Sequence, residues 1–119
     1  MNGVEAAIAR LYEALAAVDG LRVFRGIGMR LDPPAAVVGP PRLELNSIGA
    51  NPTEATFVVP VVVAQTERAL EDLMSWTPRI IEALDDVDDA VVRRADPGPW
   101  PSGAGTDLPA YLITVEVAL

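Results

Sequence analysis

The clearest hydrophobic pattern in the chain runs from Thr56 to Leu84, where a strand-like segment is followed by a helix-like one. The first segment shows little polar alternation and is rich in valine, which favours a strand. One side of this strand carries Phe57, Val59, Val61 and Val63, and the other carries Val58 and Val62. A strand that is apolar on both sides is usually covered on both faces. We therefore expect a strand over residues 56–64 and a cover for each of its faces.

Two segments have helical spacing. In the first, Asn2 is placed to cap a helix, Glu5 occupies the capping-box position, and Gly20 ends the pattern. Its apolar stripe consists of Val4, Ile8, Leu11, Tyr12, Leu15 and Val18. One such stripe needs one partner surface, so we expect this helix to cover one face of the sheet.

The second helical segment runs from Glu67 to Leu84, with Thr66 as its predicted N-cap. We expect its buried stripe to consist of Leu70, Leu73, Met74, Ile81 and Leu84. Pro78 interrupts the pattern and clashes with the carbonyl four residues earlier. We predict either a kink at Pro78 or a new helix that starts there with Thr77 as its cap.

Short alternating segments predict further strands over residues 21–25, 35–38, 42–45, 90–95 and 111–119. Residues 46–54 and 96–109 are rich in Gly, Pro, Asn and Asp and are predicted to be loops. Together these elements predict an α+β fold, a single domain over residues 1–119 in which two helices pack on a mostly antiparallel sheet.

Pro60 and Trp100 stand out against this pattern. Pro60 cannot donate a ladder hydrogen bond, so it indicates an edge strand, a bulge, or a strand that changes partner at that point. An exposed strand edge needs protection, which a neighbouring subunit can provide. Trp100 lies in the long predicted loop, and two alternatives stay open for it: packing back onto the core or anchoring an interface.

The amino-acid composition limits the kinds of function that this protein can have. The net charge is −8, the nine cationic residues are all arginine, and half of the residues are apolar. An acidic surface repels nucleic acid, which disfavours DNA wrapping or groove binding. The absence of cysteine and histidine removes disulfides, thiolate nucleophiles, Cys/His zinc sites and the usual general base. We therefore predict a non-enzymatic protein without a cofactor. The N-terminal residues do not resemble a signal peptide and no apolar run is long enough to cross a membrane, so we expect a protein made in the cytoplasm.

Two local motifs were tested against known binding patterns. Gly26-Ile27-Gly28 begins like a dinucleotide fingerprint, but Leu31 occupies the third glycine position and no helical pattern follows. The acidic run Asp85–Asp89 fails the EF-hand pattern, because the positions that need a third acid and a glycine hold Ala90 and Val91. We interpret the first motif as a turn and the second as an exposed helix end, and predict no metal site.

Four segments of the chain carry a resemblance to a known family. They are the opening helix followed by residues 20–24 (GLRVF), residues 34–41 (PAAVVGPP), residues 57–63 (FVVPVVV) before a helix, and residues 108–115 (LPAYLITV). In these segments and in the order of its elements, the chain resembles the tail terminator proteins of long-tailed bacteriophages and related prophages, of the type found in actinobacterial hosts. The likeness extends along nearly the whole chain.

The resemblance implies a structural protein of the virion. Members of this family form a ring, commonly six-fold, on the head-proximal end of the tail tube. The implied partners are other copies of the chain, the tail-tube protein and the head-connector protein, with DNA as passing cargo. From edge and loop arguments we expect the interfaces at Gly26, Gly28, Arg30, Pro60 and Trp100. Alternatives are another head–tail neck protein or a bacterial dimeric ligand-binding domain.

Overall fold

The computed structural model describes residues 3–26, 28–45, 49 and 51–119. The helices are α1 (Gly3–Ala16) and α2 (Ala69–Asp85). The strands are β1 (Arg22–Arg25), β2 (Ala35–Val38), β3 (Arg42–Leu45), β4 (Pro52–Val62), β5 (Ala90–Pro101) and β6 (Asp107–Ala118). The predicted α+β fold is confirmed. Only the β1–β2 pair is parallel among the described strand pairs, and the others are antiparallel.

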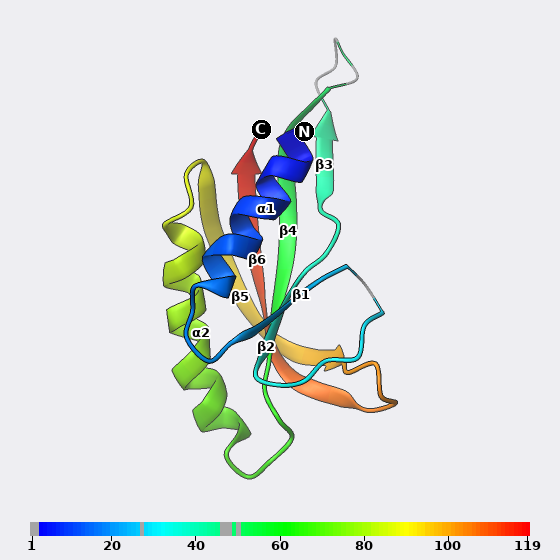
Figure 1. Ribbon diagram of the computed structural model, residues 1–119, viewed down its shortest axis with the longest axis vertical. Helices are drawn as coiled ribbons and strands as arrows, with labels where there is room; N and C mark the ends of the chain where they lie inside the picture. Colours follow the sequence, from blue (N-terminus) through cyan, green and yellow to red (C-terminus); the bar gives the residue numbers. More distant parts are fainter. Residues whose placement is uncertain (1–2, 27, 46–48, 50) are drawn as a thin grey trace.

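The sheet has the strand order β1-β2-β4-β6-β5, and β3 lies beside β4 as a separate partner. β4 and β6 therefore form its centre, and together with β5 they are its longest strands (Figure 1). Both helices cover the same face of the sheet (Figure 1). We call that side the helix face and the opposite side the back face.

The main core lies between the two helices and the helix face. The sheet contributes to this core through every second residue of β4 and of β6, because side chains alternate along a strand and these point toward the helices. Phe57, Val59 and Val61 of β4 meet Ile113, Val115 and Val117 of β6 there. The remaining buried members are Ala7, Leu11, Leu15, Ala36, Val38, Ala55, Ile80 and Leu84.

The back face is covered only in part. A second, smaller cluster buries Leu31, Ala35, Val37, Val62 and Ala110 at one end of the sheet. Val58 lies on the same face, yet 47% of it is exposed. The expectation of a cover for each face of β4 is therefore wrong at Val58, because neither helix packs on that side and the second cluster does not reach it.

α2 differs from its prediction in three respects. It continues through Pro78 as one helix, so the predicted new start at Thr77 is wrong. It begins at Ala69 with Arg68 at the N-cap position, so the predicted cap at Thr66 is wrong as well; Thr66 accepts a hydrogen bond from the Arg68 N–H in the turn before the helix. The buried face consists of Leu73, Thr77, Ile80 and Leu84. Leu70 and Met74 were expected in that stripe but are exposed, because the side of the helix that faces the sheet carries residues 73, 77, 80 and 84, and Leu70 and Met74 lie on the flank beside it.

The predicted long loop over residues 96–109 is wrong. β5 continues to Pro101 and pairs with β6 from Asp107, so that a curled β-hairpin replaces the loop (Figure 1). The Pro109 carbonyl accepts a hydrogen bond from the Val63 N–H, so the backbone groups of Pro109 point toward β4. They therefore point away from Pro99, its partner residue on β5, and the pair Pro99↔Pro109 makes no ladder hydrogen bond. Pro97, Pro99 and Pro101 consequently have their ring nitrogens on the free edge of β5. Prolines at such positions cost no ladder bond, which explains how this sequence forms a strand.

Smaller differences concern boundaries. β4 begins at Pro52, inside the predicted loop over residues 46–54. Asn2, the predicted cap of the first helix, lies outside the described residues. Within the described ranges, no helix is both long and apolar enough to cross a membrane.

Candidate interaction groove on the back face

A groove on the back face lies where β4 stops pairing with β3 and starts pairing with β2. One stretch of β4 pairs with β3, at Arg42↔Thr56, and a later stretch pairs with β2, at Ala36↔Val61. Pro60 lies in the gap between these two registers while it pairs with Leu112 of β6 on the other edge. The alternative of a strand that changes partner at Pro60 is thus confirmed.

Hydrogen-bond alternation shows why proline fits at this position. The Val63 N–H bonds the Pro109 carbonyl of the β6 strand segment, so odd-numbered residues of β4 face β6. Even-numbered residues, Val58 and Pro60 among them, face β3 and β2. The missing N–H of Pro60 therefore falls in the gap and costs no ladder bond. In the same gap the register leaves the N–H and C=O of Val58 without a ladder partner.

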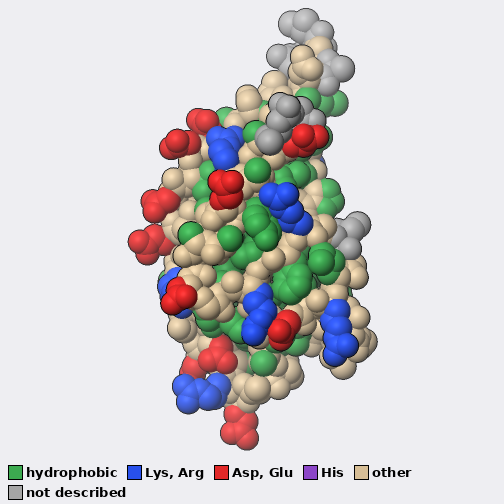
Figure 2. Space-filling model, in the orientation of Figure 1, with side chains coloured by type: hydrophobic (Ala, Val, Ile, Leu, Met, Phe, Trp, Pro, Cys, Tyr) green, Lys and Arg blue, Asp and Glu red, His purple; other side chains and the backbone are tan. Residues whose placement is uncertain are grey.

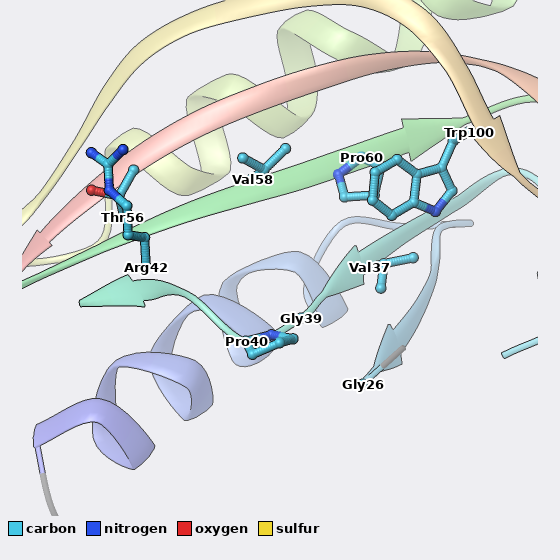
Figure 3. A pocket seen from close by; sticks show the side chains of 9 residues that line it. All are labelled: Gly26, Val37, Gly39, Pro40, Arg42, Thr56, Val58, Pro60 and Trp100. Atoms are coloured by element: carbon cyan, nitrogen blue, oxygen red, sulfur yellow. The ribbon is translucent and has the colours of Figure 1, made fainter. Parts of the chain in front are cut away.

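A cavity of about 370 Å³ occupies this part of the back face. Val58 and Pro60 of β4, Val37 of β2, Trp100 of β5 and Pro40 of the β2–β3 link form its apolar lining (Figure 3). Its remaining lining residues are Gly26, Gly39, Arg42 and Thr56. The cavity is thus built from four separate segments of the chain, at residue 26, residues 37–42, residues 56–60 and residue 100, and is mainly apolar.

A second cavity of about 220 Å³ adjoins the first and shares Gly26, Val37 and Trp100 with it. Its other lining residues are Gly28, Met29, Leu31, Pro101 and Gly103. We refer to the two adjoining cavities together as the back groove.

Four of the five residues that the sequence predicted for interfaces line the back groove. Pro60 lines the larger cavity, Gly28 the smaller one, and Gly26 and Trp100 line both. The fifth, Arg30, is exposed and lines neither, although its backbone packs against the hairpin tip. The structure therefore brings together residues that are distant in sequence, but their role at an interface stays a prediction.

Contacts of the β5–β6 hairpin hold one wall of the groove in place. The Leu31 N–H donates a 2.8 Å hydrogen bond to the Ser102 carbonyl at the hairpin tip. Gly103 has a φ of +79°, and a Cβ there would lie 2.6 Å from the Met29 carbonyl oxygen. Only glycine allows this close backbone approach. The hairpin tip and the β1–β2 loop are therefore packed as one unit.

Trp100 combines both roles that were left open for it. It packs against the second cluster, so it folds back on the core, and it remains half-buried with its indole in the groove. In Figure 3 the indole projects from β5 toward Pro60. Tryptophan is among the residue types enriched in interface hot spots, and Trp100 lines an apolar depression.

The described lining of the groove contains few polar or charged side chains. Arg42 is its one charged lining residue, and the Nε of Arg42 lies 3.3 Å from a carboxylate oxygen of Glu44. The Thr56 hydroxyl is buried without a hydrogen-bond partner among the described residues. The described ranges also contain no group of His, Cys, Asp and Glu side chains arranged to hold a metal ion. The arrangement suits the burial of an apolar partner surface better than the polarisation of a substrate.

Sequence reasoning missed Val37, Pro40 and Val58 as groove residues. The position of Val58 on the back face could be read from strand alternation, since it points opposite to Phe57 and Val59. The sequence could not show that the back face at Val58 would stay uncovered, because this depends on both helices packing on the other face of the sheet.

Searches for related proteins gave no match, either to a known protein family or to a curated protein sequence.

Proposed function

We propose that this protein is a structural subunit of a bacteriophage or prophage tail, which forms a ring at the head-proximal end of the tail tube. In this role it ends the polymerisation of tube subunits and joins the tail to the head connector. Its partners are other copies of the chain, the tail-tube protein and the head-connector protein. DNA passes through the lumen of the ring, and the assembled protein resides in the virion.

The observation that carries the proposal is the back groove, an open apolar depression on a sheet face that the chain leaves partly uncovered. A groove of this composition supports assembly with another protein surface. The likeness of four sequence segments to tail terminator proteins supports the particular assembly. The net charge of −8 agrees with a passage that does not grip DNA, because like charges repel within about a Debye length.

Two alternatives use the same features differently. A head-completion or connector-joining subunit would also form a ring but would bind the portal side instead of the tube. A dimeric ligand-binding domain would need convergent polar groups in its pocket, whereas the larger cavity offers Arg42 and Thr56.

The test is tube termination. Tail-tube subunits are polymerised with and without this protein, and tube lengths and tube ends are measured by electron microscopy. We expect shorter tubes that carry one extra ring at a single end. Tubes of unchanged length with bare ends, together with binding to the connector protein, would favour the neck-adaptor alternative and contradict the proposal.

A further inference from the structure

A row of apolar side chains lies along one exposed flank of α2, beside its buried face. Leu70 is 70% exposed and Met74 is 47% exposed, and Pro78 is exposed as well. Their spacing of four residues places all three on one side of the helix. Pro78 has no N–H and donates nothing to the Met74 carbonyl, which leaves an acceptor beside this row. We refer to these three residues as the α2 row.

The α2 row and the back groove belong to different faces of the subunit. α2 packs on the helix face through Ile80 and Leu84, and the groove opens on the back face around Val58 and Pro60. A two-fold contact requires the same patch on both subunits, whereas a contact between two different patches is head-to-tail. Repeated head-to-tail contacts close into a ring when the rotation between subunits permits it.

The charges around the two surfaces are complementary. Glu67, Glu71 and Asp72 lie in and just before the first turn of α2, where Arg68 pairs with Glu71 at 3.1 Å. Acidic side chains also line the margin of the molecule along α2 in Figure 2. Arg42 lines the groove but already pairs with Glu44 at 3.3 Å, so Arg30 beside the groove, which forms no ion pair within the described ranges, is the cation left for an acidic partner. An acidic border meeting an arginine-bordered groove favours one register of docking.

We propose that the α2 row of one subunit docks into the back groove of a second copy of the chain. The contact is a helix-in-groove contact in which Leu70 and Met74 are the i, i+4 anchors and Trp100 and Pro60 form the receiving surface. It rests on the proposed function, for which it supplies the contact between neighbouring subunits of the ring. Its geometry is head-to-tail.

The natural absence of cysteine allows a direct test by disulfide trapping. Val58→Cys and Leu70→Cys variants are mixed under mild oxidation, and the rate of cross-linked dimer formation is compared with a Val58→Cys and Glu13→Cys mixture. Glu13 is an exposed residue of α1 and serves as the matched control. We expect the Val58–Leu70 pair to cross-link at least about tenfold faster, as a 1.4 kcal/mol preference requires. Equal rates, or faster self-linking of Val58→Cys alone, would overturn the proposal.

Mixing two complementary variants tests whether this particular contact, and not another one, holds neighbouring subunits of the ring together. Val58→Asp retains the α2 row and Leu70→Asp retains the groove, so each variant alone should lose self-association while their mixture forms one-to-one dimers. Leu45→Asp alters another exposed apolar residue and should leave self-association unchanged. Rings that persist in both variants would overturn this contact and leave the proposed function standing. Cross-linked subunits that fail to terminate tubes would instead contradict the proposed function alone.

Discussion

Trp100 and Pro60 line the same cavity, although they belong to β5 and β4, which are separated in the sheet by β6. The curl of the β5–β6 hairpin brings them together, because it carries the end of β5 across the back face (Figure 1). The groove is therefore a product of hairpin shape, and each of its walls can be altered separately.

Replacing Trp100 with Ala should weaken self-association more than it weakens the fold. The indole is half-buried, so its loss should lower the free energy of unfolding by about 1–2 kcal/mol, less than the cost for a fully buried tryptophan. Urea denaturation and oligomer mass would measure the two effects. Trp76→Ala is the matched control, since Trp76 is also half-buried but packs on the main core beside Arg79. Unchanged assembly of Trp100→Ala, with a loss of several kcal/mol, would place Trp100 in a purely structural role.

Pro60→Val should change stability little, by less than about 1 kcal/mol, because no ladder bond is missing at Pro60. Val59→Pro should lower the free energy of unfolding by about 3 kcal/mol or more, because the Val59 N–H faces Ile113 of β6. Thermal or urea unfolding of both variants checks the comparison. Similar losses in the two would show that the inferred alternation of β4 is wrong.

The prolines of β5 should protect its free edge. Replacing Pro97, Pro99 and Pro101 together with Thr would restore outward N–H donors on the longest edge strand, and we expect increased intermolecular β-sheet association. Light scattering and a thioflavin signal would measure it over time. A variant with Pro40 and Pro41 replaced by Thr controls for the loss of proline as such. Equal aggregation of the two variants would mean that the edge needs no such protection.

Gly103→Ala should loosen the hairpin tip from the β1–β2 loop. The new Cβ would meet the Met29 carbonyl, in addition to the strain of about 1 kcal/mol at a positive φ. Gly105 also has a positive φ, but a Cβ there meets nothing within 4 Å, so Gly105→Ala carries the φ cost alone. We expect the first variant to lose more stability and to show faster amide exchange at Leu31. Equal effects would argue against the close packing.

Thr77→Val should stabilise the protein. The Thr77 hydroxyl is buried in the helix–sheet core and has no hydrogen-bond partner among the described residues. A methyl group of similar size removes the cost of an unsatisfied polar atom, about 1 kcal/mol. The shift in the urea midpoint measures the gain. Ser75→Val, at an exposed position of the same helix, tests whether a valine alone produces it.

Much of the fold could be predicted from local pattern. The alternation of β4 and β6 correctly indicated which valines face the helices, whereas α1 ends at Ala16, before Val18 and Gly20 that were predicted to close it. The extension of β5 was missed because proline and glycine normally indicate loops. Their spacing of two residues carries the opposite signal, since prolines at alternate positions all face one edge. That signal is interpretable only once the partner strand is known.

The error on α2 has a different origin. Its apolar residues form two neighbouring stripes, and the helix buries the one that contains Leu73, Ile80 and Leu84 together with the polar Thr77. Hydrophobicity alone favours burial of Leu70 and Met74, so the sequence pattern could not show that they would be exposed. The same holds for the groove, because its residues meet only through the hairpin curl and the change of partner along β4.

The most direct test of the central claim is the mass of the purified protein in solution over a wide range of concentration, alone and mixed with tail-tube subunits. The account predicts either a ring-sized oligomer or a monomer that assembles into rings when tube subunits are added. A strict monomer or a dimer that ignores the tube protein at every concentration would contradict it.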